Sequence, residues 1–250
     1  MIIIKNKQAV SKMTRAGQEL AQIFELLKAE VRVGRSTADL DQFIASELRR
    51  RGLVSKTLGF RGYRHVSCIS LNDEVVHGVP SASRVIKAGD LVKIDICAAW
   101  SGYCADMARC FLVDTTQVSP TVQQLVTVAY AALDLGIAQA VPGKRLSDIS
   151  AAIQAAVEQH GFGVVRDFAG HGVGKFMHED PEVPNFGRAG TGPVLQVGMT
   201  LALEPMITAG AYAVTVLADG WTVQTRDRSW AAHVEDTVLI TAAGPQVLTR

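Results

Sequence analysis

The fold is decided by two short segments that share one pattern: Gly-Asp-Leu-Val-Lys-Ile-Asp at residues 89–95 and Gly-Met-Thr-Leu-Ala-Leu-Glu at residues 198–204. Each segment begins with a turn glycine and continues as a strand-like run. Each ends on a carboxylate, Asp95 or Glu204, where a buried strand usually carries an apolar residue. The second segment lies 109 positions after the first (198 minus 89), which indicates that the chain contains an internal repeat.

The same offset of 109 positions aligns other residues of the two halves. One register shift matches a helix start, a helix end and a strand, and it pairs Gly34 with Gly143, Asp39 with Asp148, Ile44 with Ile153, and Gly52 with Gly161. This predicts a single domain over residues 1–250, built from two homologous half-repeats at about 10–115 and 118–248. A pseudo-twofold axis between them would bring Asp95 and Glu204 to equivalent places.

Composition describes a soluble globular protein. The 250 residues are 48% hydrophobic and carry a net charge of +1, so the chain can bury a substantial core. A near-neutral charge gives no electrostatic argument for binding nucleic acid or a membrane surface. We find no signal peptide and no apolar run that approaches the length of a membrane span, which predicts a cytoplasmic location. Because no C-x-x-C pair occurs, the cysteines are predicted to be reduced thiols: Cys68, Cys97, Cys104 and Cys110.

Apolar spacing, glycines and capping residues predict the order of the elements. They are a helix from Ser11 to Val31, a helix capped by Thr37, a hairpin with strands near 91–99 and 104–113, a helix from Thr121 to Val141, a helix capped by Ser147, and a strand-rich remainder after Gly161. The second half carries about twenty extra residues between Glu204 and Glu235, which we predict to form a hairpin or loop containing Trp221.

Four carboxylates are predicted to meet near the pseudo-twofold axis: Asp95, Asp106, Glu204 and Glu235. Taken alone, Asp95 could equally belong to a solvated strand face. Bringing four carboxylates together is electrostatically unfavourable, because a like-charged pair at ~4 Å costs on the order of 4 kcal/mol at an effective dielectric of about 20. Divalent cations would neutralise all four at once. His171, framed by glycines at residues 170–174, could complete an oxygen-rich ligand set of the kind found in two-metal hydrolases.

Other catalytic motifs fail on spacing. Residues 170–174 match neither G-x-G-x-x-G nor a P-loop, so a phosphate-binding site is not indicated. His178-Glu179 lacks a second histidine at position 182, which is Glu182, so no H-E-x-x-H zinc helix exists. No G-x-S-x-G sequence is present, which argues against a serine hydrolase of that class.

Several motifs spread over the chain together resemble the type I methionine aminopeptidases. The motifs are NDEVVHGVP at residues 72–80, Ile94-Asp95, Asp106, GHGVG at 170–174, HEDP at 178–181, EPM at 204–206 and DGWTV at 219–223. The resemblance runs from about residue 10 to 248 and is to the bacterial type, without an N-terminal zinc-binding extension. It implies an α+β, duplicated pseudo-twofold "pita-bread" fold, with helices on the outer face of an antiparallel sheet.

The resemblance also implies the site residues. Two divalent ions, Co, Mn, Fe(II) or Zn, would be held by Asp95, Asp106, His171, Glu204 and Glu235, with Asp106 and Glu235 bridging them. The resemblance assigns contacts with the peptide to His77 and His178. On chemical grounds we predict that Glu204, beside a metal-bridging hydroxide, takes and later returns a proton, while His77 or His178 donates to the developing oxyanion or the peptide nitrogen. Methionine would enter a pocket lined by Phe60, Tyr63, Cys68, Met177 and Trp221. The implied reaction is removal of N-terminal methionine before a small second residue, from nascent polypeptide N-termini, by a monomer in transient contact with the ribosome.

Four residues depart from the family pattern: Phe60, Met107, Met177 and Asp236. The run Glu235-Asp236-Thr237 is closer to the related prolidases and Xaa-Pro aminopeptidases, which keeps a peptidase of that type as an alternative. A non-catalytic binding protein on the same fold is a second alternative, and its signature would be the loss of one or more metal ligands. None of the five is missing here.

Overall fold

A nine-stranded sheet forms the centre of the structure, which is a computed structural model describing residues 1–250. All its strand pairs are antiparallel, and the main path runs β1-β4-β5-β14-β9-β7-β8, with β2 added to β4 and β15 to β14. The strands are β1 (Val54–Ser55), β2 (Cys68–Leu71), β4 (Leu91–Trp100), β5 (Tyr103–Leu112), β7 (Gly170–Gly172), β8 (Glu179–Val183), β9 (Thr200–Leu203), β14 (Glu235–Thr241) and β15 (Gly244–Val247). The predicted hairpin is therefore confirmed as β4 and β5.

Two small sheets flank the large one. One has the order β13-β10-β6 and the other β11-β12-β3. Their strands are β3 (Glu74–Val76), β6 (Gly163–Val164), β10 (Met206–Thr208), β11 (Val214–Val216), β12 (Val223–Thr225) and β13 (Ala231–His233). Strands β11 and β12 form the hairpin predicted between Glu204 and Glu235, and Trp221 lies in its turn region.

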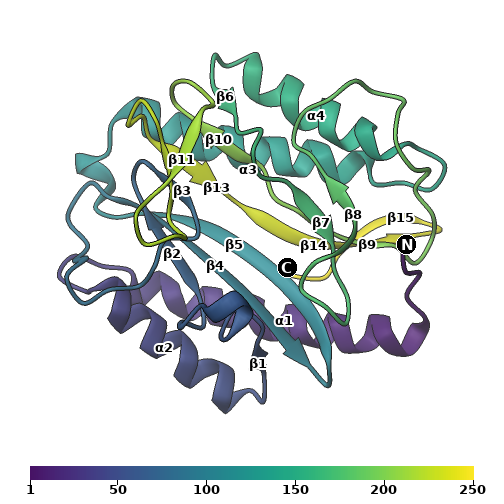
Figure 1. The fold of residues 1–250 in the computed structure, drawn as a ribbon, viewed down its shortest axis with the longest axis horizontal. Coiled ribbons are helices and arrows are strands. Elements are labelled where there is room, and N and C mark those ends of the chain that lie inside the picture. Colours follow the sequence, from purple (N-terminus) through teal and green to yellow (C-terminus); the bar gives the residue numbers. More distant parts are fainter.

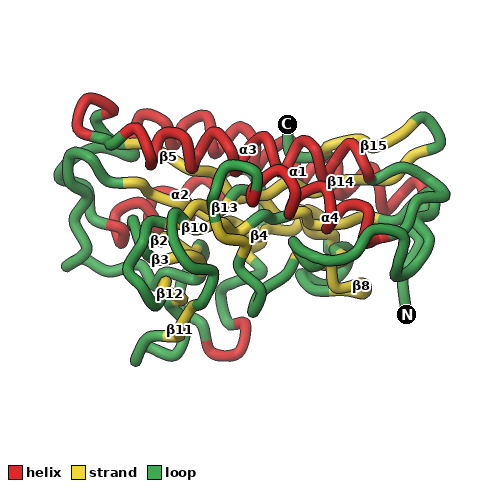
Figure 2. The backbone as a smooth tube through the Cα atoms, turned by 90° about the horizontal axis from the view of Figure 1, so that it is seen from above, coloured by secondary structure: helices red, strands yellow, loops and turns green.

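Four α-helices lie on one side of the large sheet, while loops and the small β11 and β12 strands extend from the other (Figures 1 and 2). The helices are α1 (Lys7–Glu30), α2 (Thr37–Arg50), α3 (Pro120–Gln139) and α4 (Leu146–Glu158), joined by the short 3-10 helices η1 (Phe60–Gly62) and η2 (Thr115–Gln117). The apolar faces of the helices pack onto the sheet and form its core, as amphipathic helices on a sheet do. The predicted α+β class with helices on one face is confirmed.

The offset of 109 positions recurs in the backbone geometry of the two halves. Gly34 and Gly143 have φ of 87° and 88°, a region that glycine enters without strain. The amide of Gly34 donates to Ile86 and that of Gly143 to Leu195, both at 3.0 Å. Isolated bridges join Ser36 to Val85 and Arg145 to Val194. Matching bonds at matching positions are what a duplicated unit produces, whereas the bounds of the half-repeats and the single-domain organisation stay predictions.

Two predicted helix caps were wrong by one or two residues. The cap of α2 is Ser36, whose Oγ accepts from the amide of Asp39 while the Asp39 carboxylate accepts from the amide of Ser36. The hydroxyl of Thr37 instead donates to Ser81. Helix α4 begins at Leu146, and the hydroxyl of Ser147 donates to Thr191. In both cases a long-range partner took the hydroxyl that local sequence had assigned to the cap.

Helix α3 is the one helix long and apolar enough to cross a membrane by length and composition, with 20 residues and a mean hydropathy of 1.2. The expectation that no apolar run approaches this length was wrong for α3. Half of the most apolar 18-residue stretch of α3 is buried inside the protein. The helix packs against α4 and the sheet. Its apolar character is therefore explained by its place in the core.

Candidate metal centre and peptide cleft

Strand pairing places three carboxylates on one face of the sheet. Ala108 on β5 pairs with Asp95 on β4 and also with Glu235 on β14. Asp106 lies two residues before Ala108 on β5, and residues two apart share a face of a strand. The Asp106 backbone is held to β14, because its amide donates to Thr237 Oγ1 at 2.8 Å and that hydroxyl donates back to the Asp106 carbonyl at 2.9 Å. Register alone therefore brings these three acids together.

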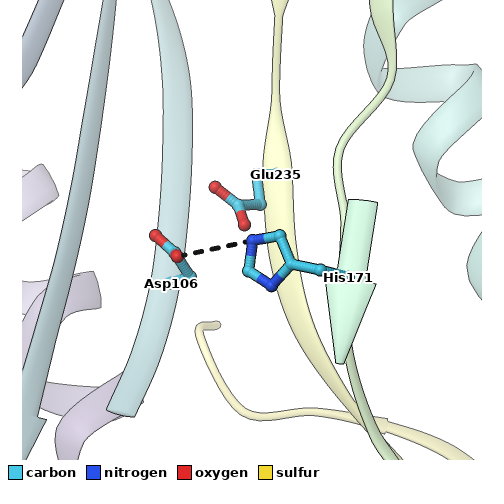
Figure 3. A group of neighbouring side chains, drawn as sticks. All are labelled: Asp106, His171 and Glu235. Atoms are coloured by element: carbon cyan, nitrogen blue, oxygen red, sulfur yellow. Dashed lines mark ion pairs between the residues drawn. The ribbon is translucent and has the colours of Figure 1, made fainter. Parts of the chain in front are cut away.

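His171 and Glu204 reach the same place from β7 and from the end of β9. His171 on β7 pairs with Ala202 on β9, and Glu204 follows β9 directly. The His171 Nε2 atom lies 3.4 Å from Glu204 Oε1 and 3.9 Å from Asp106 Oδ2. Its Nδ1 lies 2.9 Å from the carbonyl of Gly172, and donation there leaves the lone pair on Nε2, facing the acids. Figure 3 shows Asp106, His171 and Glu235 converging from three strands, with ligand atoms within 4.8 Å of one another.

The acid cluster has no positively charged side chain to balance its negative charges. Burial, followed by the charge of Glu204, raises the pKa of Asp106 to about 7. Burial raises the pKa of Glu204 to about 8 and, with the neighbouring acids, lifts the pKa values of Asp95 and Glu235 well above their ordinary range. Burial also lowers the pKa of His171 to about 4. No lysine or arginine pairs with any of the four acids, so the protein supplies no cation of its own there.

Two oxygens of the cluster are buried without a hydrogen bond, Asp106 Oδ1 and Glu235 Oε1. A buried carboxylate oxygen without a partner is unfavourable, and buried charges are normally paired or bound to metal. Carboxylate oxygens and one neutral imidazole nitrogen suit borderline divalent ions. The residues present therefore fit a divalent metal site.

A cavity of about 820 Å³ opens in front of the cluster. It is lined by every site residue expected from the sequence: Phe60, Tyr63, Cys68, His77, Asp95, Asp106, His171, Met177, His178, Glu204, Trp221 and Glu235. The structure thus brings the whole predicted set together around one space, large enough for the end of a peptide.

The aromatic wall of the cavity is built from edge-to-face contacts. The rings of Tyr63 and Trp221 have centroids 4.9 Å apart, and those of Phe60 and His178 lie 5.4 Å apart. Trp221 is held because Asp219 accepts hydrogen bonds from the amides of Trp221 and Thr222. Phe60 lies in η1 and Tyr63 directly follows it, Trp221 comes from the turn between β11 and β12, and His178 directly precedes β8.

Two further imidazoles face the cavity. Burial lowers the pKa of His77 to about 4, and burial followed by the charge of Arg61 lowers the pKa of His178. Both are therefore neutral at neutral pH and carry one N–H each. The His178 ring stacks edge-on against His171 with centroids 4.4 Å apart, which places it beside the acid cluster.

One residue of the site was missed by the sequence analysis. His233 on β13 is 2% exposed, and its Nε2 lies 3.3 Å from Glu204 Oε2. A signal for it existed, because His233 stands two residues before Glu235, the spacing that keeps residues on one face of an extended chain. The spacing was not used, since nothing in the sequence showed that the strand before Glu235 also borders the cluster.

Comparisons with known proteins agree with this geometry. The model of metallopeptidase family M24 matches residues 11–242. Curated methionine aminopeptidases from Clostridium acetobutylicum and Bacillus subtilis are each 43% identical, over 249 and 250 residues that span the whole of this chain and 99% and 100% of the relatives. The chain belongs to the methionine aminopeptidase family of M24 metallopeptidases.

Solved structures of the family have the same fold. A methionine aminopeptidase from Thermotoga maritima matches with a TM-score of 0.98 and 40% identity, covering 100% of both chains. A prolidase from Pyrococcus furiosus matches with a TM-score of 0.79 and 22% identity over 99% of this chain and 65% of its own, which shows the fold alone. Membership of the M24 family makes this chain a metal-dependent hydrolase of peptides. The curated relatives favour the methionine type over the prolidase alternative.

Proposed function

We propose that this chain removes the N-terminal methionine from peptides and nascent polypeptides, with two divalent ions at the acid cluster. The residues that would hold the ions are Asp95, Asp106, His171, Glu204 and Glu235. The observation that carries the proposal is a set of four buried acids with no protein cation, two of them with a buried oxygen that lacks any hydrogen bond. The cytoplasm, where nascent chains emerge, would be its place of action.

Divalent ions bound there would act as Lewis acids toward the scissile carbonyl and lower the pKa of water at the cluster. The rest of the reaction depends on side chains of this chain. Glu204, whose pKa burial raises to about 8, is suited to accept a proton during attack and return it to the leaving nitrogen. The neutral His77 and His178 can each donate an N–H toward the peptide carbonyl or the developing oxyanion.

Selection of methionine is assigned to the aromatic wall. A thioether side chain inserted among Phe60, Tyr63, Met177 and Trp221 would be removed from water, which is worth roughly 1.5–3 kcal/mol. Cys68, whose pKa burial raises well above its usual range, would stay a neutral thiol at the wall of this pocket. A small second residue is expected from the likeness to methionine aminopeptidases.

A cleavage screen on metal-stripped protein, repleted with Mn²⁺, Fe²⁺, Co²⁺ or Zn²⁺ in turn, tests the proposal. Release of methionine from Met-Ala-Ser and Met-Gly peptides, with much slower release from Met-Arg peptides, is the expected result. Turnover of Xaa-Pro peptides instead would favour the prolidase-like alternative. No turnover with any ion would favour a non-catalytic binding protein on this fold.

The same screen tests the role of Glu204. Replacing its carboxylate by an amide in Glu204→Gln removes the proton acceptor, a change worth about 10²–10⁴-fold in rate for general acid–base groups. Full activity of this variant would remove Glu204 from the proposed mechanism.

A further inference from the structure

His233 is a buried imidazole to which the mechanism above gives no role. It lies on β13, which is paired with β10 so that His233 stands opposite Met206. Its carbonyl accepts a hydrogen bond from Cys110 Sγ at 3.3 Å, so the strand is fixed on both sides. The ring nitrogen Nε2 is buried and has no hydrogen-bond partner, and the nearest acidic atom is Glu204 Oε2 at 3.3 Å.

The two oxygens of Glu204 therefore have different neighbours. Oε1 lies 3.4 Å from His171 Nε2, on the side of the candidate metal ligands. Oε2 lies on the opposite side, next to His233. The backbone of Glu204 is held as well, because Asn185 Nδ2 donates to its carbonyl at 2.9 Å. Three different residues therefore approach Glu204: one at its backbone carbonyl and one at each carboxylate oxygen.

A neutral imidazole can present either ring nitrogen to a carboxylate. Only the nitrogen that carries the hydrogen can donate a hydrogen bond to the carboxylate. The 3.3 Å approach does not have hydrogen-bond geometry as it stands. If the proton of His233 sits on Nε2, a small rotation of the ring or the carboxylate turns this approach into a donated hydrogen bond and gives the buried nitrogen its missing partner. If the proton sits on Nδ1 while bound ions keep Glu204 deprotonated, two lone pairs face each other in a buried place. The first arrangement satisfies both groups.

We propose that His233 is a positioning residue, which donates its Nε2–H to Glu204 Oε2 and thereby directs Glu204 Oε1 toward the divalent ions. The inference rests on the proposed function, because it assigns Glu204 as a metal ligand and proton acceptor. Groups that orient a metal-ligating side chain affect metal affinity and activity by about 10–100-fold when they are removed.

The test compares two substitutions of similar length, His233→Gln, which keeps an N–H donor, and His233→Met, which has none. For His233→Met, kcat on Met-Ala-Ser is expected to fall by about 10–100-fold with KM within about twofold, and the dissociation constant of the weaker Mn²⁺ ion is expected to rise about tenfold. His233→Gln should stay within about threefold of the wild type in all three quantities. Matched controls are His160→Gln and His160→Met, because His160 is exposed on the surface.

Calorimetric titration of the stripped proteins with Mn²⁺ gives a readout independent of activity. A wild-type kcat and Mn²⁺ affinity in a folded His233→Met would overturn the proposal, as would a His233→Gln that is impaired equally while keeping its melting temperature. If the wild type binds Mn²⁺ but cleaves no Met-Ala-Ser, the proposed function fails while the titrations still decide the role of His233.

Nitrogen-15 NMR of the histidine rings in the Zn²⁺-loaded wild-type protein, where bound ions keep Glu204 deprotonated, gives a check that needs no apolar variant to fold. The His233 signals are identified by their absence from His233→Gln. The proposal expects the proton on Nε2, and a proton on Nδ1 would contradict it.

Discussion

Glu235 and Asp236 are consecutive acids on β14 with opposite surroundings. Both are almost fully buried, at 2% and 0% exposure, and alternation along the strand turns them to opposite faces of the sheet. On the helix side, Asp236 accepts from Arg109 Nη2 at 2.6 Å, from Arg250 Nε at 2.8 Å and from Thr249 Oγ1 at 2.7 Å. On the cleft side, Glu235 has no cation and one oxygen without any hydrogen bond.

The contrast shows that burial alone does not identify a functional acid. Where the fold supplies two guanidinium groups, a buried carboxylate is a structural ion pair. Where it supplies none, burial followed by Asp106 and Glu204 holds the pKa of Glu235 well above its ordinary range. A cation from outside the chain would neutralise that cluster, which agrees with membership of a metallopeptidase family.

The largest expected effect is on the cleft side. Glu235→Gln removes a metal ligand, and losing several kcal/mol of charge stabilisation lowers kcat on Met-Ala-Ser by about 10³-fold. The same change relieves repulsion, so the melting temperature of the metal-free protein should rise. Steady-state kinetics and thermal unfolding of the stripped variant measure both, and an active Glu235→Gln with an unchanged melting temperature would contradict the assignment.

The matched change on the helix side has the opposite sign. Asp236→Asn leaves two arginines without their carboxylate, and breaking a buried pair costs on the order of 3 kcal/mol, at the low end of the usual range because Arg250 is partly exposed. For a chain of this length the melting temperature should fall by roughly 6–12 °C. Mn²⁺ affinity should stay near that of the wild type. A stable Asp236→Asn, or one that loses its metal affinity first, would contradict the separation of the two faces.

The pH dependence of the metal-free protein should come from the cleft side. Burial raises the pKa of Asp106 to about 7 and of Glu204 to about 8, so above pH 4 the folded state holds protons that the unfolded state has lost. Stability therefore falls as pH rises through 7–8, by about 1.4 kcal/mol per pH unit for each acid still protonated. Burial lowers the pKa values of His77, His171 and His233 to about 4, which opposes the fall only up to about pH 6.5.

Thermal unfolding with chelator at pH 6.5, 7.0, 7.5 and 8.0 measures this slope. It should be shallower in Glu235→Gln and unchanged in Asp236→Asn when the shift in melting temperature is taken into account. Bound Mn²⁺ should remove the slope, because the ions hold the acids deprotonated. Equal slopes in all of these samples would place the pH dependence elsewhere.

The smallest effect concerns the cavity wall. Phe60 lines the cavity, whereas Phe176 is 67% exposed and does not. Phe60→Ala should raise KM for Met-Ala-Ser about tenfold, because it removes apolar contact with the methionine side chain. The kcat should change little, because this contact is equally strong in the ground state and in the transition state. Phe176→Ala is the control and should leave KM unchanged. An equal rise in KM in both variants would argue against a pocket at Phe60.

The surroundings of Glu235 and Asp236 differ in how well they could be predicted from the sequence. Strand-like runs and turn residues placed the hairpin and, with it, Asp95 and Asp106, because register alone decides which side chains share a face. The partners of Asp236 were out of reach, since Arg109 and Arg250 meet it only after β5, β14 and the end of the chain are assembled. His233 was missed for the same reason.

The predicted N-caps of α2 and α4 were wrong by one or two residues. The hydroxyls of Thr37 and Ser147 bind Ser81 and Thr191, each 44 positions away, and local sequence carries no record of such partners. Side-chain positions set by strand alternation were therefore predictable, while those set by contacts between distant segments were not.

Anomalous diffraction from crystals grown with Mn²⁺ would test the role of the uncompensated acids. Two peaks are expected between β5 and β14, in contact with Asp95, Asp106, His171, Glu204 and Glu235, with none near Asp236. An acid cluster without bound Mn²⁺ at millimolar concentration, or Mn²⁺ bound only on the helix side, would contradict the metal-dependent peptidase.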